Sequence, residues 1–305
     1  MAKARFVHIV DDVPELVGRS DGPVLIVALE GFLDAGNASA LATGHVEEAG
    51  DGGRVVASFE IDEFYDYRAR RPALTFSENR YTDYETPRLV VKLLHDAQHT
   101  PFLLLTGPEP DTRWEGFATA VRAVIDHFSV RLTLSLGSVP MAVPHTRPVQ
   151  LTNHATSERL VVQENVWRGD IRVPASAQGL LEVRLGEWGY DAMGFVAHIP
   201  HYVAQYPYPQ AAAALVEAVT DTTGLVWDIS GLLEAGARTA EEIASQIKES
   251  DDVREVVRGL EQQYDAFHQA EDNLLAEDAP IPSGDELGAQ FEQFLAGLDD
   301  EGGDR

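Results

Sequence analysis

The chain has no cysteine and few basic residues, and each shortage excludes a class of function. Without cysteine among its 305 residues, the protein has no disulfide, no thiol nucleophile and no thiolate metal site. Lys and Arg number 23 against 50 Asp and Glu, so the formal net charge is −27. Because proteins bind phosphate backbones and anionic lipids through Lys and Arg, this charge argues against nucleic acid and membrane partners.

Long hydrophobic runs are also missing. No window approaches the roughly 18 apolar residues that a membrane-spanning helix requires. The first residues include basic side chains, but their short apolar patch is interrupted by His8 and ends at Asp11 and Asp12. We therefore expect no signal peptide and a cytoplasmic location.

The common sequence signatures of enzymes are absent as well. The chain has no Walker lysine loop and no GxGxxG, GxSxG or HExxH motif. A phosphate loop and paired basic residues, which ATP-dependent ligation would need, are not found either. The sequence therefore predicts no catalytic residue, no metal and no cofactor, and it leans against an enzyme without excluding one.

What the chain does contain is a series of apolar segments of strand length that alternate with helical ones. Val24–Leu29 has no polar alternation, as expected of a strand buried on both faces of a parallel sheet. A turn at Gly31 and a helix from Ala38 to Glu48 follow it. Further strands are expected at Phe6–Val10, Arg54–Ile61, Leu89–Leu94, Pro101–Thr106, Arg131–Leu136, Leu160–Glu164, Ile171–Val173 and Ala192–Ile199, with helices from Thr112 to Phe128, near Ala177–Trp188 and at Gln210–Val219.

This alternation predicts a three-layer α/β/α sandwich with a helical appendage at the C-terminal side. We expect the sandwich to span residues 1–228 and the appendage residues 229–276. Residues 277–305 read as an acidic linker and a short amphipathic helix. The appendage contains a capping-box pattern at Thr239–Glu242 and an apolar stripe that would pack on the sandwich or on a partner. The stripe consists of Val253, Val257, Leu260, Tyr264 and Phe267.

Polar side chains follow the apolar strands where each strand ends. If those strands are parallel, the polar groups gather along one edge of the sheet, where small ligands bind in α/β proteins. His198 and His201 could then work with Asp34 as acid and base or as metal ligands. Alternatively, these groups hydrogen-bond to the loop backbone and stabilise the edge. The candidate pocket residues are Asp34, Asn37, Glu109, Ser138, His145, His198, His201 and Tyr202.

An aromatic and basic segment stands out in this acidic chain. Tyr and Arg are favoured at protein interfaces, and the acidic surface of a second copy would supply complementary charge. The segment therefore favours a homo-oligomer, although a surface loop with locally packed tyrosines would look the same. The candidate interface residues are Tyr65, Tyr67, Arg68, Arg70 and Arg71, with Arg80 and Tyr81 nearby.

Four motifs, in this order, resemble the proteasome assembly chaperone 2 family. They cover about residues 22–222, and the whole chain is similar to a longer bacterial branch with an acidic helical extension. The motifs are Gly31–Asn37 after the first strand, Gly107–Pro110 with Trp114, Gly137–Pro140 with Pro144–Pro148, and Ala197–Tyr202 with Tyr206 and Pro207.

The resemblance implies a core like that of the nucleoside phosphorylase and hydrolase sandwich, and oligomerisation, for instance as a trimer. It implies no established catalytic activity. Better-understood relatives are adaptors or chaperones for proteasome α-subunits, and some bind through a C-terminal tripeptide of a hydrophobic residue, tyrosine and any residue. This chain ends Glu301–Arg305 without that tripeptide, so we do not expect docking into proteasome pockets by this terminus.

The sequence thus favours a non-enzymatic, assembly-chaperone-like protein that interacts with proteasome subunits or another protein. The alternative is a protein that binds a nucleoside-like ligand, or a hydrolase or phosphorylase, with its pocket at the carboxyl ends of the strands.

Overall fold

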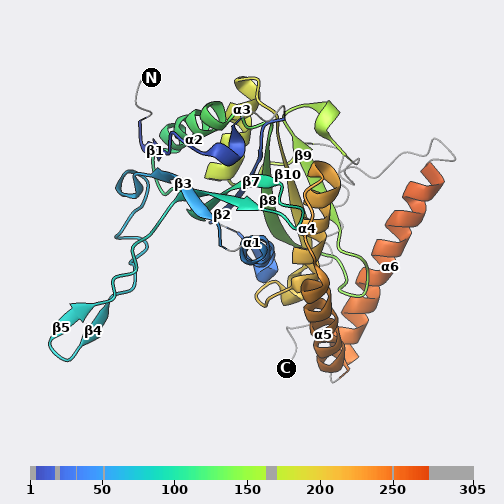
Figure 1. Ribbon diagram of the computed structural model, residues 1–305. Helices are drawn as coiled ribbons and strands as arrows, with labels where there is room; N and C mark the ends of the chain where they lie inside the picture. Colours follow the sequence, from blue (N-terminus) through green and yellow to red (C-terminus); the bar gives the residue numbers. More distant parts are fainter. Residues whose placement is uncertain are drawn as a thin grey trace.

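The structure is a computed structural model that describes residues 5–17, 21–31, 33–50, 52–162, 170–248 and 251–274. A mixed eight-stranded sheet lies at its centre, in the order β1-β3-β6-β7-β2-β8-β10-β9 (Figure 1). The strands β7, β2, β8 and β10 run parallel, and the remaining pairings are antiparallel. The strands are β1 Val7–Ile9, β2 Val24–Glu30, β3 Arg54–Phe59, β6 Val90–His95, β7 Pro101–Pro108, β8 Leu132–Met141, β9 Leu151–Ala155 and β10 Ala192–Pro200.

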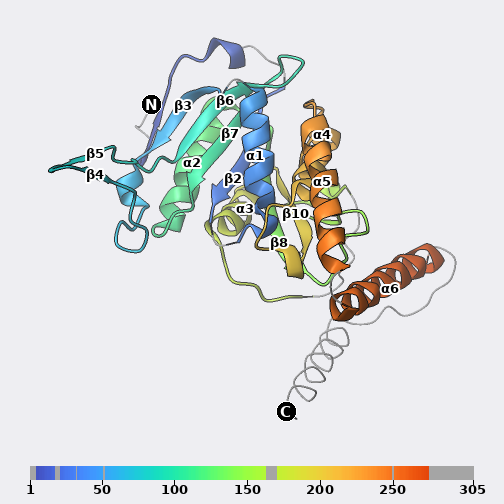
Figure 2. The same cartoon turned by 90° about the horizontal axis from the view of Figure 1, so that it is seen from below.

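Helices cover both faces of the sheet, which confirms the predicted three-layer sandwich (Figure 2). The sequence of strand β2 explains why both faces are covered. Its apolar residues point to both sides: Val24 and Ile26 pack in the core on one face, while Leu25 packs in the core on the other. The helices α1 Ala38–Ala49, α4 Pro209–Thr223 and α5 Ser230–Ile247 lie on the first face, and α2 Trp114–Phe128 and α3 Ala177–Glu187 lie on the second.

Two expected helix starts, at Thr112 and at the Thr239–Glu242 capping box, differ from the structure. Helix α2 begins at Trp114, and the Thr112 hydroxyl donates a hydrogen bond to the backbone oxygen of Glu63 at 3.2 Å instead of capping the helix. Thr239 lies inside the continuous helix α5. A four-residue capping pattern is short, and here a tertiary hydrogen bond and a longer helical context override it.

Two features of the predicted sheet also differ from the structure. Strands β6 and β7 are antiparallel, because the turn between them is too short for the crossover that parallel strands need. The edge strand β9 lies at Leu151–Ala155, whereas Glu158–Leu160 forms a single 3₁₀ turn and Ile171–Val173 is no strand. The expected strand at Leu160–Glu164 lies partly outside the described residues.

A separate hairpin projects from the sandwich. Strands β4 (Thr75–Ser77) and β5 (Arg80–Thr82) pair only with each other and extend away from the main sheet (Figures 1 and 2). The segment that connects β3 with β6 therefore forms an arm rather than a layer of the sandwich.

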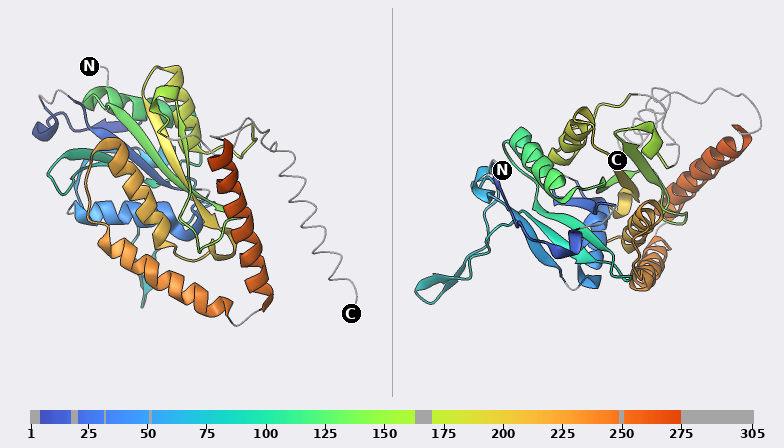
Figure 3. Two further views of the ribbon diagram at one scale, coloured as in Figure 1. Left: turned by 90° about the vertical axis from the view of Figure 1, so that its right-hand side faces the viewer. Right: turned by 45° about the horizontal axis from the view of Figure 1, so that its top comes forward.

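The C-terminal helices begin with α5, whose Gly236 oxygen accepts a 2.7 Å hydrogen bond from the Gln210 side chain of α4. Helix α6 (Asp251–Leu274) then extends beside the sandwich (Figure 3). Within its predicted stripe, Val257 is buried while Val253 is exposed. The terminal helix expected within residues 277–305 lies outside the described residues. None of the described helices is long and apolar enough to cross a bilayer.

Candidate functional site at the carboxyl ends of the strands

Asp34 lies just beyond β2 and is fully engaged by its neighbours. Its carboxylate accepts hydrogen bonds from the backbone N–H groups of Ser39 at 2.8 Å and Ala40 at 2.9 Å, in the first turn of α1. It also accepts one from the Ser138 hydroxyl at 2.7 Å, and the two residues form a parallel β-bridge. A carboxylate at the start of a helix satisfies N–H groups that have no partner within the helix. Asp34 therefore ties α1 to the ends of β2 and β8.

The tight turn into α1 depends on backbone conformation. Gly36 has φ +66°, and a Cβ on it would lie 2.7 Å from the Cβ of Tyr208. Asn37 follows in the left-handed region, and its exposed side chain makes no capping hydrogen bond. Position 36 requires glycine, because glycine tolerates both the positive φ and the close approach of Tyr208. The same turn leaves the Asn37 amide at the surface.

Glu109, beyond β7, connects three elements. One of its carboxylate oxygens accepts a 2.7 Å hydrogen bond from the backbone N–H of Ala177, at the start of α3. Its backbone oxygen accepts a 2.5 Å hydrogen bond from Arg70, and the same guanidinium pairs with Asp111 at 2.7 Å. The strand before Glu109 bends at Gly107, where φ is +128° and a Cβ would lie 2.1 Å from the Arg88 oxygen. Glu109 thus joins the hairpin base to α3.

His198 lies within β10 and is 5% exposed. Its Nε2 atom is 2.8 Å from the hydroxyl of Thr152 on β9. Burial lowers the pKa of His198 to about 4. The imidazole is consequently neutral at pH 7, and it is a weak base.

His145 and Tyr202 form a second polar pair at this edge. The Tyr202 hydroxyl accepts a hydrogen bond from the His145 backbone N–H at 2.9 Å and lies 2.7 Å from Nδ1 of its ring. Burial lowers the pKa of His145 and raises the pKa of Tyr202 to about 12. Both groups are therefore uncharged near pH 7, with the phenol proton available to Nδ1.

Helix α6 reaches the loop that carries His145. The Arg147 guanidinium forms a two-pronged contact with Asp265 at 2.7 and 2.6 Å, and Glu261 contacts Thr146. The Tyr264 hydroxyl donates a hydrogen bond to the backbone oxygen of Pro148 at 3.3 Å. These contacts hold α6 against its own chain.

The structure brings some of the predicted pocket residues together and separates others. Asp34 and Ser138 share one face of the sheet with Ala197, which pairs in register with Ser138. His198 is the next residue of β10, so its side chain points to the opposite face. Asp34 and His198 therefore lie at one edge of the sheet, as expected, but do not face a common space. His201 is exposed, and its ring packs on Tyr202.

Within the described residues, no group of three His, Asp or Glu side chains is arranged to hold a metal ion. Sequence reasoning missed the partners that occupy the candidate groups, above all Thr152, Arg147 and Asp265. Thr152 lies 46 residues from His198 along the chain, and Arg147 lies 118 residues from Asp265, so neither contact leaves a local sequence pattern.

The candidate interface residues lie at the base of the hairpin. Arg70 stacks over the Tyr65 ring at 4.7 Å, and the Tyr67 hydroxyl donates a 2.6 Å hydrogen bond to Asp62. That hydrogen bond raises the pKa of Tyr67 to about 12. Arg68 and Arg71 are exposed. Tyr65, Tyr67 and Arg70 thus make contacts within their own chain, whereas the other two arginines are exposed on the surface of the arm.

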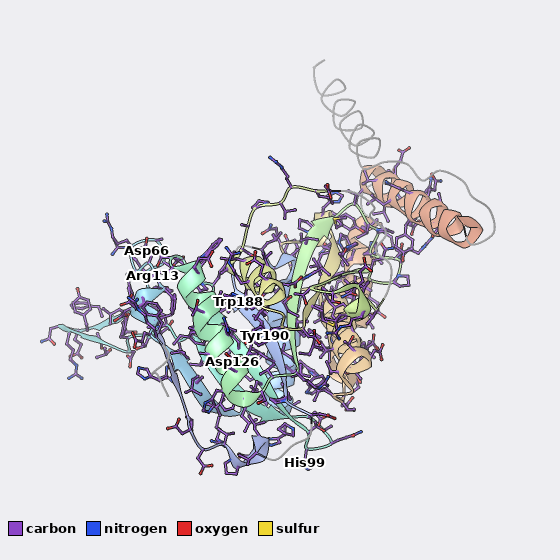
Figure 4. The ribbon with its side chains drawn as sticks, turned by 90° about the horizontal axis from the view of Figure 1, so that it is seen from above. Asp66, His99, Arg113, Asp126, Trp188 and Tyr190 are labelled. Carbon is purple, nitrogen blue, oxygen red and sulfur yellow. The ribbon has the colours of Figure 1, made fainter. Side chains whose placement is uncertain are left out.

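The opposite side of the molecule has its own polar clusters. Tyr190 lies beside Asp126 and Trp188 along α2, while Arg113 and Asp66 lie towards its N-terminal end (Figure 4). Arg122 stacks over the Trp188 ring at 5.1 Å. These contacts join α2 to the segment after α3 and leave the polar groups engaged with each other.

Comparison with known proteins places these observations in context. The model of the PAC2 family matches residues 28–249. A solved structure of a Mycobacterium tuberculosis protein of unknown function is 44% identical, with a TM-score of 0.81, and the match covers 90% of this chain and 93% of that one. A Corynebacterium glutamicum protein of unknown function is 36% identical, with a TM-score of 0.80 and coverage of 87% and 99%.

A third structure, a proteasome-assembly chaperone homologue from Mycobacterium tuberculosis, is 27% identical with a TM-score of 0.71. That match covers 77% of this chain and 99% of that one. Among curated proteins, none matches the chain.

Proposed function

The chain belongs to the PAC2 family, and we propose that it is an assembly-chaperone-like protein that acts by binding other protein chains. One of its structural neighbours is described as a proteasome-assembly chaperone homologue. We therefore propose proteasome subunits as the first partners to test, and a cytoplasmic site of action.

The observation that carries the proposal is the composition of the projecting hairpin. Its large apolar side chains are exposed: Phe76 by 60% and Tyr81 by 71%, with Leu74 and Tyr84 about half exposed. Phe76 and Tyr81 pair across the two strands, and their ring centroids lie 5.0 Å apart. Exposed apolar residues grouped in this way are characteristic of interaction sites.

The energetics of a two-stranded hairpin support the same conclusion. An isolated pair of strands is marginally stable in water, because it has no third strand or helix against which to bury a side-chain face. The hairpin gains such a surface if it packs on another chain. Arg68 and Arg71 at its base are exposed in a molecule of net charge −27, so a second copy provides complementary charge. We therefore propose a homo-oligomer in which the arm contacts a neighbouring copy.

Multi-angle light scattering of the full chain tests self-association. The wild-type protein is expected to exceed the 33.4 kDa mass of one chain, and the double variant Phe76→Asp with Tyr81→Asp is expected to have a lower mass. Val183→Asp is the matched control, since Val183 is 55% exposed on α3, away from the hairpin. A wild-type monomer, or an oligomer that the double variant leaves intact, would contradict the role of the arm.

Binding to purified proteasome α-subunits tests the chaperone-like role separately. Biolayer interferometry with immobilised full-length protein is expected to show saturable binding of the α-subunits, and an unrelated acidic protein immobilised in the same way is expected to show none. If self-association is intact and no α-subunit binds, the partner assignment is wrong while the oligomer proposal stands.

A further inference from the structure

The segment that leads into α3 has no regular secondary structure and exposes its apolar side chains. Ile171 is 68% exposed and Val173 is 75% exposed, with exposed Arg172 between them. The sequence predicts a strand here, but no backbone hydrogen bond joins residues 171–173 to any other described segment. A stretch with the alternation of a strand and with unpaired backbone groups is suited to pairing with an exposed sheet edge.

Strand β4 of the arm offers such an edge. Among the described residues β4 pairs only with β5, so alternate N–H and C=O groups along its other side have no partner strand. The hairpin continues past β4, because the Glu85 N–H donates a 3.0 Å hydrogen bond to the Ala73 oxygen. Leu74 and Phe76 are both exposed and lie two residues apart, so they point to the same face of this edge.

The apolar spacing of the two parts matches. Ile171 and Val173 are also two residues apart. A strand laid beside β4 therefore places them next to Leu74 and Phe76, whichever way the strand runs. The other edge of the hairpin is a poorer match, because the positions two residues to either side of Tyr81 on β5 are polar. Strand β4 is thus the edge that the segment fits.

Within one chain the two parts do not meet. The hairpin extends away from the sandwich, and the segment that leads into α3 does not lie beside it (Figures 2 and 3). The charge favours a second copy as the partner, since Arg68 and Arg71 are exposed at the base of the arm and the chain as a whole carries −27. Each copy therefore has one open strand edge and one unpaired segment that fits it.

From this match we propose that residues 171–173 of one copy add to the outer edge of β4 in a second copy, as the third strand of its arm. The inference rests on the homo-oligomer proposed above and names the surface that receives the arm. The added strand forms backbone hydrogen bonds with β4 and covers its two exposed apolar side chains with Ile171 and Val173. A third strand and a covered apolar face are what an isolated two-stranded hairpin lacks.

Disulfide crosslinking in the full chain tests this pairing, since the protein has no cysteine of its own. Thr75 lies between the two apolar residues of the β4 edge, and Arg172 lies between those of the segment, so these two positions are opposite each other in either strand direction. After oxidation, Thr75→Cys with Arg172→Cys is expected to give covalently linked chains on a non-reducing gel, about 10-fold or more above the control. The control is Thr75→Cys with Val183→Cys, since Val183 is 55% exposed on α3, the helix that follows the segment.

Light scattering supplies a second readout and separates this inference from the proposed homo-oligomer. Ile171→Asp with Val173→Asp is expected to lower the mass of the oligomer, whereas Ile171→Val with Val173→Ile, which keeps both side chains apolar, is expected to preserve it. A wild-type monomer would overturn both the oligomer and the strand addition. A wild-type oligomer whose cysteine variant gives no crosslink above the control, or whose mass the Asp double variant leaves unchanged, would overturn the strand addition alone.

Discussion

Because His198 is buried as a neutral imidazole, the protein is expected to be less stable in mild acid. The native pKa is about 4 because the ring is buried, whereas the ordinary histidine value is 6.5. Between these two values the unfolded chain binds a proton that the native chain does not. Unfolding is therefore favoured as pH falls, because stability rises with pH wherever the unfolded state binds more protons.

The size and window of the effect follow from the same two values. The contribution of His198 is fully present above pH 6.5, is lost progressively down to about pH 4, and does not change below that. At 1.36 kcal/mol per pKa unit, the loss is about 3 kcal/mol. Burial lowers the pKa of His145 as well, so its contribution has the same sign.

Urea unfolding between pH 7.5 and 4.5, at fixed protein concentration, measures the effect. His198→Gln keeps an amide near Thr152 but does not titrate, so its free energy of unfolding is expected to fall by about 2 to 3 kcal/mol less than that of wild type over this range. His99→Gln is the control, since His99 lies on an exposed turn at the surface (Figure 4). An equally steep fall in wild type and His198→Gln would refute the reasoning.

Three further substitutions test contacts at the same edge. Asp34→Ala leaves two helix N–H groups and the Ser138 hydroxyl without their carboxylate, and urea unfolding is expected to show a loss of about 2 to 4 kcal/mol. Gly107→Ala places a Cβ 2.1 Å from a backbone oxygen at positive φ, so a loss of more than about 3 kcal/mol or no soluble protein is expected. Arg147→Ala removes the exposed pair with Asp265; limited proteolysis is expected to cut α6 faster, while the core loses less than about 1 kcal/mol. Unchanged midpoints in the first two variants, or unchanged cleavage in the third, would contradict these expectations.

Much of the sandwich can be predicted from the apolar segments. Strand Val24–Leu29 and helix Ala38–Glu48 are found almost at their expected bounds, as β2 and α1, because continuous burial leaves a continuous apolar run. Strand direction was predicted less well, since it depends on how long the connection between two strands is. The short, half-exposed edge strand β9 was misplaced because neither of its faces is uniformly apolar.

The candidate site was predictable only in outline. Parallel strands place Asp34, Ser138 and His198 at one edge, which the chain order alone suggests. The face to which each side chain points depends on register, and a shift of one residue reverses it.

The bond from Asp34 to the first turn of α1 has a consequence for nucleotides. In α/β proteins a phosphate often binds to the free N–H groups at the N-terminus of such a helix. In this chain the Asp34 carboxylate already accepts hydrogen bonds from two of these N–H groups. A phosphorylated ligand would be repelled by this carboxylate and would have to displace it before it could bind to the same N–H groups.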